Sequence, residues 1–126
     1  MDIERQVGFW REGAEEDMDV AGELMERKRY RHALFFAEVA LEKLLKALVV
    51  QETAAVPPKT HDLLQLLQQA GIDSPDERRL FLARFQQYNI EGRYPEHMPD
   101  TPSREEADKG IDECRETIEW LSSLFR

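Results

Sequence analysis

The residue types best suited to chemistry gather in one short segment, YNIEGRYPEHMP, at positions 88–99. Arg93 can hold a phosphate group through two parallel hydrogen bonds, and the imidazole of His97 can transfer a proton near neutral pH. Tyr88 and Tyr94 add aromatic rings with polar hydroxyl groups. Pro95 directly follows Tyr94 and restricts the backbone of Tyr94 to extended conformations. We therefore predict a rigid loop that presents Arg93 and Tyr94 in a fixed direction and serves as the contact site of the domain.

Three further side chains could contribute to binding. Lys43 and Lys46 lie on the polar side of a predicted central helix, from which they could line a groove that faces the 88–99 segment. His61 lies at the start of a predicted short helix, where a neutral imidazole is favoured over a charged one. A packing or hydrogen-bonding role is the alternative for His61. The predicted binding set for a nucleotide or a partner protein is Arg93, Tyr94, Tyr88, Lys43, Lys46 and His61.

The patterns of metal, cofactor and triad sites are missing from the sequence. Its three histidines, His32, His61 and His97, are far apart, and the single cysteine, Cys114, rules out a thiolate cage. The sequence has no glycine-rich phosphate loop and no Gly-x-Ser-x-Gly pattern. It also lacks the Glu-x-x-His pairs of di-metal carboxylate bundles. We therefore expect neither a metal nor a cofactor.

Length and composition indicate one globular domain, residues 1–126, with 41% apolar and 34% charged residues. The longest apolar run, LLKALVV, is too short to span a bilayer, so we expect no membrane segment. The first ten residues, MDIERQVGFW, lack the apolar stretch of a secretory signal. Together with the single cysteine, this absence predicts a cytoplasmic protein.

The charge of the chain is uneven. The net charge of -9 argues against loose binding to nucleic acid, because the average surface repels phosphate groups. One segment, ERKRYRH at positions 26–32, carries four basic side chains against one acid. This segment could contact an anion, although a solvated turn between two helices is the favoured interpretation.

Hydrophobic periodicity predicts helices throughout, and no run alternates as a strand does. Prolines and glycines separate the helices, and the short connections favour antiparallel neighbours. The predicted fold is an all-α, antiparallel up-and-down bundle of about five helices. The predicted helices cover residues 3–27, 30–52, 61–70 with Thr60 as N-cap, 75–88, and a last helix after the capping residue Ser103.

The second helix has few polar residues, and they lie on one side. Glu38, Glu42, Lys43 and Lys46 fall within an arc of about 140° at 100° per residue. The rest of the circumference is apolar, which indicates either the central helix of a bundle or a helix that also packs against a second chain. Glu42 and Lys46 are predicted to form an exposed ion pair.

Three pieces of the sequence, in order, are similar to a known family. HALFFAEVALEKLLKALVV, PPKTHDLLQLL and YNIEGRYPE together resemble the small prokaryotic HEPN domain, named for higher eukaryotes and prokaryotes and proposed to bind nucleotides. The resemblance covers nearly the whole chain. It implies a bundle of four or five helices, usually a homodimer. It also implies frequent pairing with a separate minimal nucleotidyltransferase in a toxin–antitoxin-like module.

Some HEPN domains are metal-independent ribonucleases whose motif is an Arg, four to six residues, and a His. Here Arg93 and His97 are separated by only three residues, while Arg27 and His32 have four between them but lie between the first two helices. The resemblance therefore favours a dimer without catalytic activity that binds a nucleotide or a nucleotidyltransferase. A ribonuclease toxin acting on RNA through an Arg/His pair, and a helical adaptor without a small ligand, are the alternatives.

Overall fold

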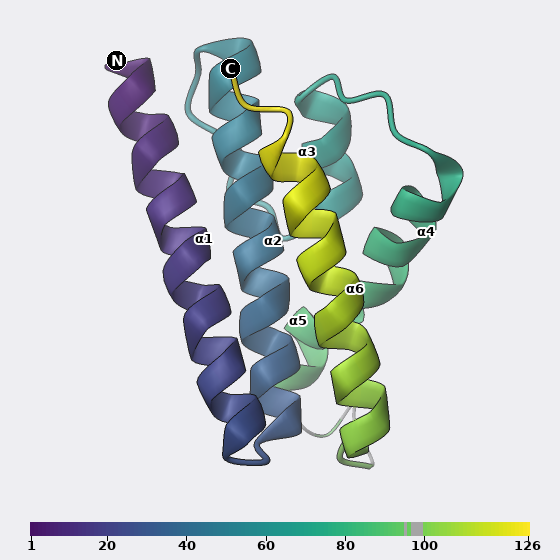
Figure 1. The fold of residues 1–126 in the computed structure, drawn as a ribbon. Helices are drawn as coiled ribbons and strands as arrows, with labels where there is room; N and C mark the ends of the chain where they lie inside the picture. Colours follow the sequence, from purple (N-terminus) through teal and green to yellow (C-terminus); the bar gives the residue numbers. More distant parts are fainter. Residues whose placement is uncertain (95, 97–99) are drawn as a thin grey trace.

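The computed structural model describes residues 1–94, 96 and 100–126, and in this part of the chain every regular element is a helix. The three long helices are α1 (Ile3–Glu26), α2 (Tyr30–Thr53) and α6 (Arg104–Ser122) (Figure 1). Figure 1 shows them side by side, with α2 between the other two. The predicted all-α bundle is therefore confirmed.

Three short helices return the chain from the end of α2 to the start of α6. They are α3 (Leu63–Gln69), α4 (Asp76–Phe85) and α5 (Gln87–Arg93). The α1 and α2 helices are antiparallel, as their short connection requires. Because α4 and α5 run back along the bundle, α6 has the same direction as α2, and the two helices end close together (Figure 1).

Side-chain caps account for where two of these helices begin. The Ser103 hydroxyl accepts a 3.0 Å hydrogen bond from the backbone nitrogen of Glu106, which confirms the predicted cap of α6. The third helix starts later than predicted, because Asp62 and not Thr60 is its N-cap. The Asp62 carboxylate accepts hydrogen bonds from the backbone nitrogens of Leu64 and Gln65, at 3.0 and 3.2 Å.

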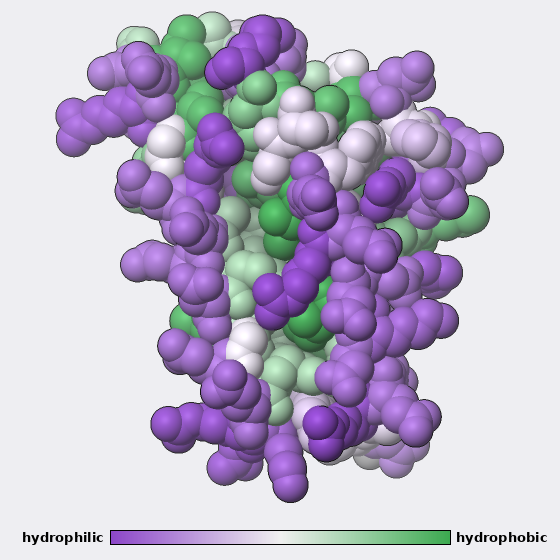
Figure 2. Space-filling model, in the orientation of Figure 1, coloured by the Kyte–Doolittle hydropathy of each residue, from purple (hydrophilic) through white to green (hydrophobic). Residues whose placement is uncertain are grey.

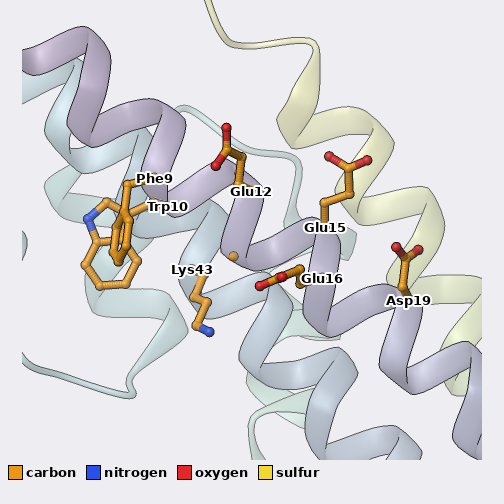
Figure 3. A pocket seen from close by; sticks show the side chains of 8 residues that line it. Phe9, Trp10, Glu12, Glu15, Glu16, Asp19 and Lys43 are labelled. Atoms are coloured by element: carbon orange, nitrogen blue, oxygen red, sulfur yellow. The ribbon is translucent and has the colours of Figure 1, made fainter.

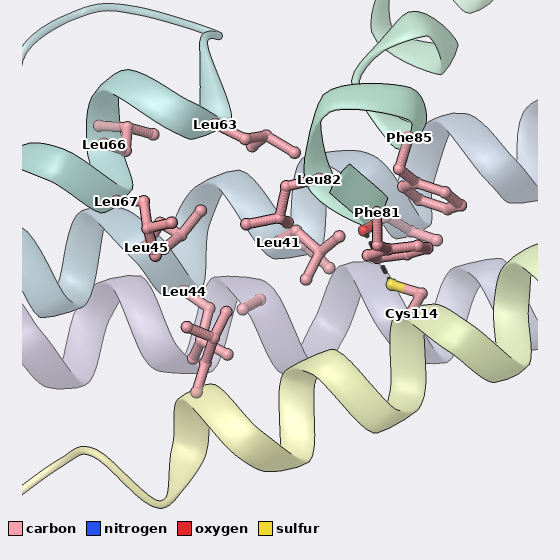
Figure 4. Packing of buried hydrophobic residues seen from close by; sticks show 14 of the residues in the cluster. Leu41, Leu44, Leu45, Leu63, Leu66, Leu67, Phe81, Leu82, Phe85 and Cys114 are labelled. Carbon is pink, nitrogen blue, oxygen red and sulfur yellow. Dashed lines mark hydrogen bonds between the residues drawn. The ribbon is translucent and has the colours of Figure 1, made fainter. Parts of the chain in front are cut away.

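The hydrophobic core is built around α2, which contacts α1, α3, α5 and α6. Figure 4 shows leucines of α2 meeting leucines of α3 and the aromatic rings of α4. The α2 helix is thus the central helix of the bundle, and one chain covers most of its apolar circumference. Its fully buried leucines pack with those of other elements, including Leu34, Leu41, Leu45, Leu48, Leu63, Leu66, Leu82 and Leu121.

One face of the bundle carries an apolar furrow between α1 and α6. Figure 2 shows apolar side chains down the middle of this face, with polar side chains on both sides. Met18, Leu44 and Ile118 line a cavity of about 310 Å³ there. The guanidinium of Arg11 covers one end of the furrow, 4.1 Å from the centroid of the Phe125 ring. In the described part of the chain, no helix is long and apolar enough to cross a membrane.

Candidate functional site

The segment expected to be a loop is helical over its first half. The predicted fourth helix, 75–88, is in fact two helices, because the chain turns at Gln86 and α5 then continues to Arg93. Nothing in this stretch prevents a helix, since the first proline follows it. Gly92 lets α5 approach α2 closely, because a methyl group at this position would overlap the ring of Phe35. The predicted loop is therefore wrong over residues 88–93, and Pro95 and His97 lie outside the described residues.

Arg93, at the end of α5, is held on two sides. Its Nε atom donates a 3.3 Å hydrogen bond to Oδ1 of Asn89, one turn earlier. Its guanidinium carbon lies 5.3 Å from the centroid of the Phe35 ring, a cation–π arrangement. Arg93 is exposed, and its two terminal nitrogens make no hydrogen bond to any other described residue. The side chain therefore has a fixed direction and two donors available to an anion.

A row of polar side chains on α2 lies beneath this arginine, and it is buried. Glu38, Glu42 and Lys46 occupy successive turns and are 0%, 6% and 7% exposed. Nδ2 of Asn89 donates a 2.9 Å hydrogen bond to Oε2 of Glu38. Nζ of Lys46 lies 3.2 Å from Oε2 of Glu42, so the predicted exposed pair is a buried one. The predicted exposure of the Glu42–Lys46 pair is wrong because α1, α5 and His61 cover this side of α2.

The carboxyl group of Glu38 has an unusual protonation equilibrium. Burial away from water raises its pKa from 4.5 to about 8, and the nearby Glu42 carboxylate adds to the rise. The hydrogen bond from Asn89 and the charges of Arg93 and Lys46 act in the opposite direction. Its second oxygen, Oε1, has no hydrogen-bond partner among the described residues. The neutral acid is therefore favoured at neutral pH, with Oε1 as the natural place for the proton.

His61 joins the row from the segment between α2 and α3. Its Nδ1 atom lies 2.7 Å from Oε1 of Glu42, so the carboxylate orients the ring. The side chain remains 59% exposed, which leaves the opposite edge of the imidazole open to solvent. A cavity of about 450 Å³ begins at this ring and extends to α5. Its lining residues are His61, Asp62, Ala83, Gln86, Gln87, Asn89 and Ile90.

The two predicted lysines contact α1. Nζ of Lys43 lies 2.8 Å from Oδ2 of Asp17, and Nζ of Lys46 lies 5.4 Å from the centroid of the Trp10 ring. Figure 3 shows Lys43 beside Glu16 and near Trp10, in a cleft of about 650 Å³ on the seam between α1 and α2. Both lysines thus contact side chains of α1.

The two tyrosines have different environments. Tyr88 is 8% exposed, and its hydroxyl donates a 3.1 Å hydrogen bond to Oε2 of Glu106, which ties α5 to α6. It belongs to the core and contributes no open ring. Tyr94 is 52% exposed and directly follows Arg93. Arg93 and Tyr94 are thus neighbours at the end of α5. Asn89, which accepts a hydrogen bond from Arg93, also lines the cavity that begins at His61.

The other Arg–His pair lies at the turn between α1 and α2. Arg27 is the C-cap of α1 and His32 lies in the first turn of α2. Both side chains are at least partly exposed, and no described residue links them by a hydrogen bond. His32 lies one helical turn before Phe35, the ring on which Arg93 stacks.

Part of α2 remains open between α1 and α5. Phe35, Phe36, Val39 and Lys43 are only half-buried, whereas the other residues over positions 33–50 of α2 are buried. At 100° per residue these four side chains fall within an arc of about 100°. We call them the open strip. Arg93 stacks on its edge at Phe35.

Sequence reasoning missed several residues of this site. Asn89 precedes Arg93 by four positions, which is the spacing for contact within a helix. This spacing has no such meaning in a loop, which is what the sequence predicts for residues 88–99. Glu38 and Glu42 share a face at the same spacing, yet their burial depends on segments far away in the sequence. Phe35 could not be recognised as the ring under Arg93, because nothing in the sequence distinguishes it from the other aromatic residues.

Comparison with known proteins identifies the fold and the family. The HEPN domain model matches residues 7–124. The crystal structure of TT1696 from Thermus thermophilus superposes with a TM-score of 0.81 at 24% identity, covering 94% of this chain and 97% of that one. No curated protein sequence matches the chain significantly. The family match covers nearly all of the bundle, including the Arg93 site, and the chain therefore belongs to the HEPN domain family.

Proposed function

We propose that this chain acts as a HEPN homodimer without catalytic activity that binds a nucleotide, with Arg93 on the phosphate groups. In a toxin–antitoxin-like module it would work beside a minimal nucleotidyltransferase, as the sequence resemblance implies. The observation that carries the proposal is the environment of Arg93. Its guanidinium is fixed by Asn89 and Phe35, and its two terminal nitrogens remain available as donors. A pre-positioned arginine loses little conformational freedom when it binds an anion.

The cavity beside Arg93 supports a nucleotide as the ligand. Its volume of about 450 Å³ lies in the range of small-molecule sites. The Gln86 side-chain oxygen accepts a 3.1 Å hydrogen bond from the backbone nitrogen of Leu63, which orients its NH₂ group. The side-chain amides of Gln86 and Gln87 can both donate and accept hydrogen bonds, and the polar edge of a nucleotide base offers donors and acceptors in turn. Ile90, 54% exposed, offers an apolar surface to the base.

The open strip supports dimerisation. A helix that is apolar nearly all round is normally covered on every side, and over residues 33–50 of α2 only Phe35, Phe36, Val39 and Lys43 are not buried. A second copy would cover these side chains. Because Arg93 stacks on Phe35, such a dimer would place the arginines of both copies beside the contact.

Two measurements test the proposal. Sedimentation equilibrium at micromolar concentration should give twice the chain mass of 14.8 kDa. Calorimetric titration with nucleoside triphosphates should give saturable binding with one site per chain. A monomer mass with no heat of binding for any nucleotide would contradict the proposal. Cleavage of RNA in EDTA that is lost in Arg93→Ala or Arg27→Ala would contradict the absence of catalysis and support the ribonuclease alternative.

A further inference from the structure

The edge of α1 beside the open strip carries an acid near its middle and a base at its C-terminal end. Phe9 and Arg27 are 18 residues apart, about five full turns, so they lie on the same line along α1. Glu16 and Val20 fall within about 20° of that line. Figure 3 shows Phe9 and Glu16 on the seam with α2, where Glu16 lies beside Lys43. The edge therefore reads aromatic, acidic, apolar and basic, in that order.

The contacts between α1 and α2 fix the height of these residues along the bundle. Gly13 packs against the side chain of Lys43, and Lys46 lies over the ring of Trp10. Because α1 and α2 are antiparallel, Val20 is then level with the stretch of α2 from Phe36 to Val39. The midpoint between Glu16 and Arg27 lies one to two residues from Val20. The half-buried apolar centre of this face is thus flanked by an acid on one side and a base on the other, and a two-fold axis that pairs Glu16 with Arg27 passes one to two residues beyond Val20.

We propose that a second copy of the chain packs on this face about a two-fold axis near Val20 and Phe36, with Glu16 of each copy facing Arg27 of the other. The inference rests on the proposed dimer and assigns its surface and register. A two-fold contact brings the same patch of both copies together, so a patch with an acid and a base at equal distances from its centre is self-complementary. The apolar centre supplies the area, and the two ion pairs fix the antiparallel alignment of α1 with α1 of the second copy.

The charges of this face favour a second copy as the occupant. Among the described residues, neither Glu16 nor Arg27 has an ion-pair partner within its own chain. With a net charge of -9, two copies repel each other over most of their surface. If the basic turn at Arg27 of one copy faces the acidic edge of α1 of the other, the two copies attract each other at the contact.

The furrow between α1 and α6 is a weaker choice for the second copy. The chain itself bridges the two ends of the furrow. Arg11 lies over Phe125 at one end, and Arg115 lies against Gly22 at the other.

Charge reversal tests the register directly. Glu16→Arg and Arg27→Glu should each weaken dimerisation about tenfold or more in sedimentation equilibrium at low salt, because two symmetry-related pairs become two like-charge contacts. The double variant Glu16→Arg/Arg27→Glu should restore the wild-type dissociation constant within about threefold. Matched controls are Glu116→Arg and Arg115→Glu, exposed residues of α6 with the same changes of charge, and neither should alter dimerisation.

A cross-link gives a second measurement that does not depend on charge. Oxidation of the Glu16→Cys/Arg27→Cys variant should yield a covalent dimer, and the buried Cys114 should not react. A wild-type dimer whose mass is insensitive to both reversals, with no cross-link, would overturn the register and leave the proposed dimer standing. A wild-type chain that stays monomeric would overturn the proposed dimer and the register together. Circular dichroism of every variant separates loss of contact from loss of fold.

Discussion

Asn89 and Glu38 are joined by a buried hydrogen bond of 2.9 Å, in which Nδ2 of Asn89 donates to the carboxyl group. The same amide accepts from Arg93 through Oδ1. One side chain of α5 thus connects an exposed arginine to an acid on the central helix. This connection fixes the position of Arg93, on which the proposed phosphate contact depends.

Removal of that amide should destabilise the fold. Asn89→Ala leaves the Glu38 carboxyl group buried without its donor, and we expect a loss of about 2 kcal/mol in the free energy of unfolding. Gln87→Ala removes an amide from an exposed position of the same helix and should change stability by less than about 0.5 kcal/mol. Urea unfolding at a fixed protein concentration measures both variants. An equal loss of unfolding free energy in the two variants would mean that the buried hydrogen bond does not stabilise the fold.

Glu38 should make stability fall as the pH rises. Its pKa is about 8 in the folded chain against 4.5 as the ordinary value, so the folded state holds the proton more tightly. This contribution is fully present below pH 4.5, declines between pH 4.5 and 8, and is lost above pH 8. Glu38→Gln removes the titration and should be more stable than the wild type by about 3 kcal/mol at pH 7.

The difference in stability between Glu38→Gln and the wild type should be measured as a function of pH. Urea unfolding of Glu38→Gln and wild type at pH 4.5, 6, 7 and 8 should give a gap that widens with pH. A gap of the same size at every pH would show that Glu38 does not change its protonation in this range.

Gly92 should be needed for the contact between α5 and α2. Gly92→Ala pushes a methyl group into the Phe35 ring, and we expect a loss of about 1–3 kcal/mol in stability together with weaker nucleotide binding. Gly8→Ala is the control, because a methyl group there meets open space in a helix and should stabilise by about 0.5–1 kcal/mol. Thermal unfolding followed by circular dichroism distinguishes the two. A Gly92→Ala variant as stable as the wild type would contradict the close packing.

Tyr88 should matter for stability and not for binding. Tyr88→Phe removes the hydroxyl that donates to Glu106 and keeps the ring against Phe85. We expect a loss of about 0.5–1.5 kcal/mol in the free energy of unfolding and an unchanged nucleotide affinity. Calorimetric titration of this variant checks the second point. A clear drop in affinity would return Tyr88 to the contact site from which its burial removes it.

How far the sequence predicts this protein depends on the range of the interactions involved. The helices were predicted from periodicity and caps, which are local, and Ser103 caps α6 as its spacing indicates. The burial of Glu38, Glu42 and Lys46 could not be predicted, because the covering groups come from α1, α5 and the segment before α3. Periodicity marks a polar side of a helix, but it does not distinguish solvent from a polar partner.

The residue type and the family resemblance predict Arg93 as a contact residue, whereas they do not predict the side chains that hold it. Asn89 and Phe35 hold the guanidinium from two different helices, and only the folded chain brings them together. The predicted lysines illustrate the same limit. They share the polar side of α2 with Glu42, but the position of α1 directs them toward Asp17 and Trp10.

The most direct test of the account is the nucleotide affinity of an Arg93 variant. Calorimetric titration of wild type, Arg93→Gln and the control Arg79→Gln, an exposed arginine of α4, should use the same nucleoside triphosphates. We predict that Arg93→Gln weakens binding at least about tenfold, because a bidentate phosphate contact is lost, while Arg79→Gln binds as the wild type does. Equal affinities for all three proteins would contradict the assignment of Arg93 to the phosphate groups.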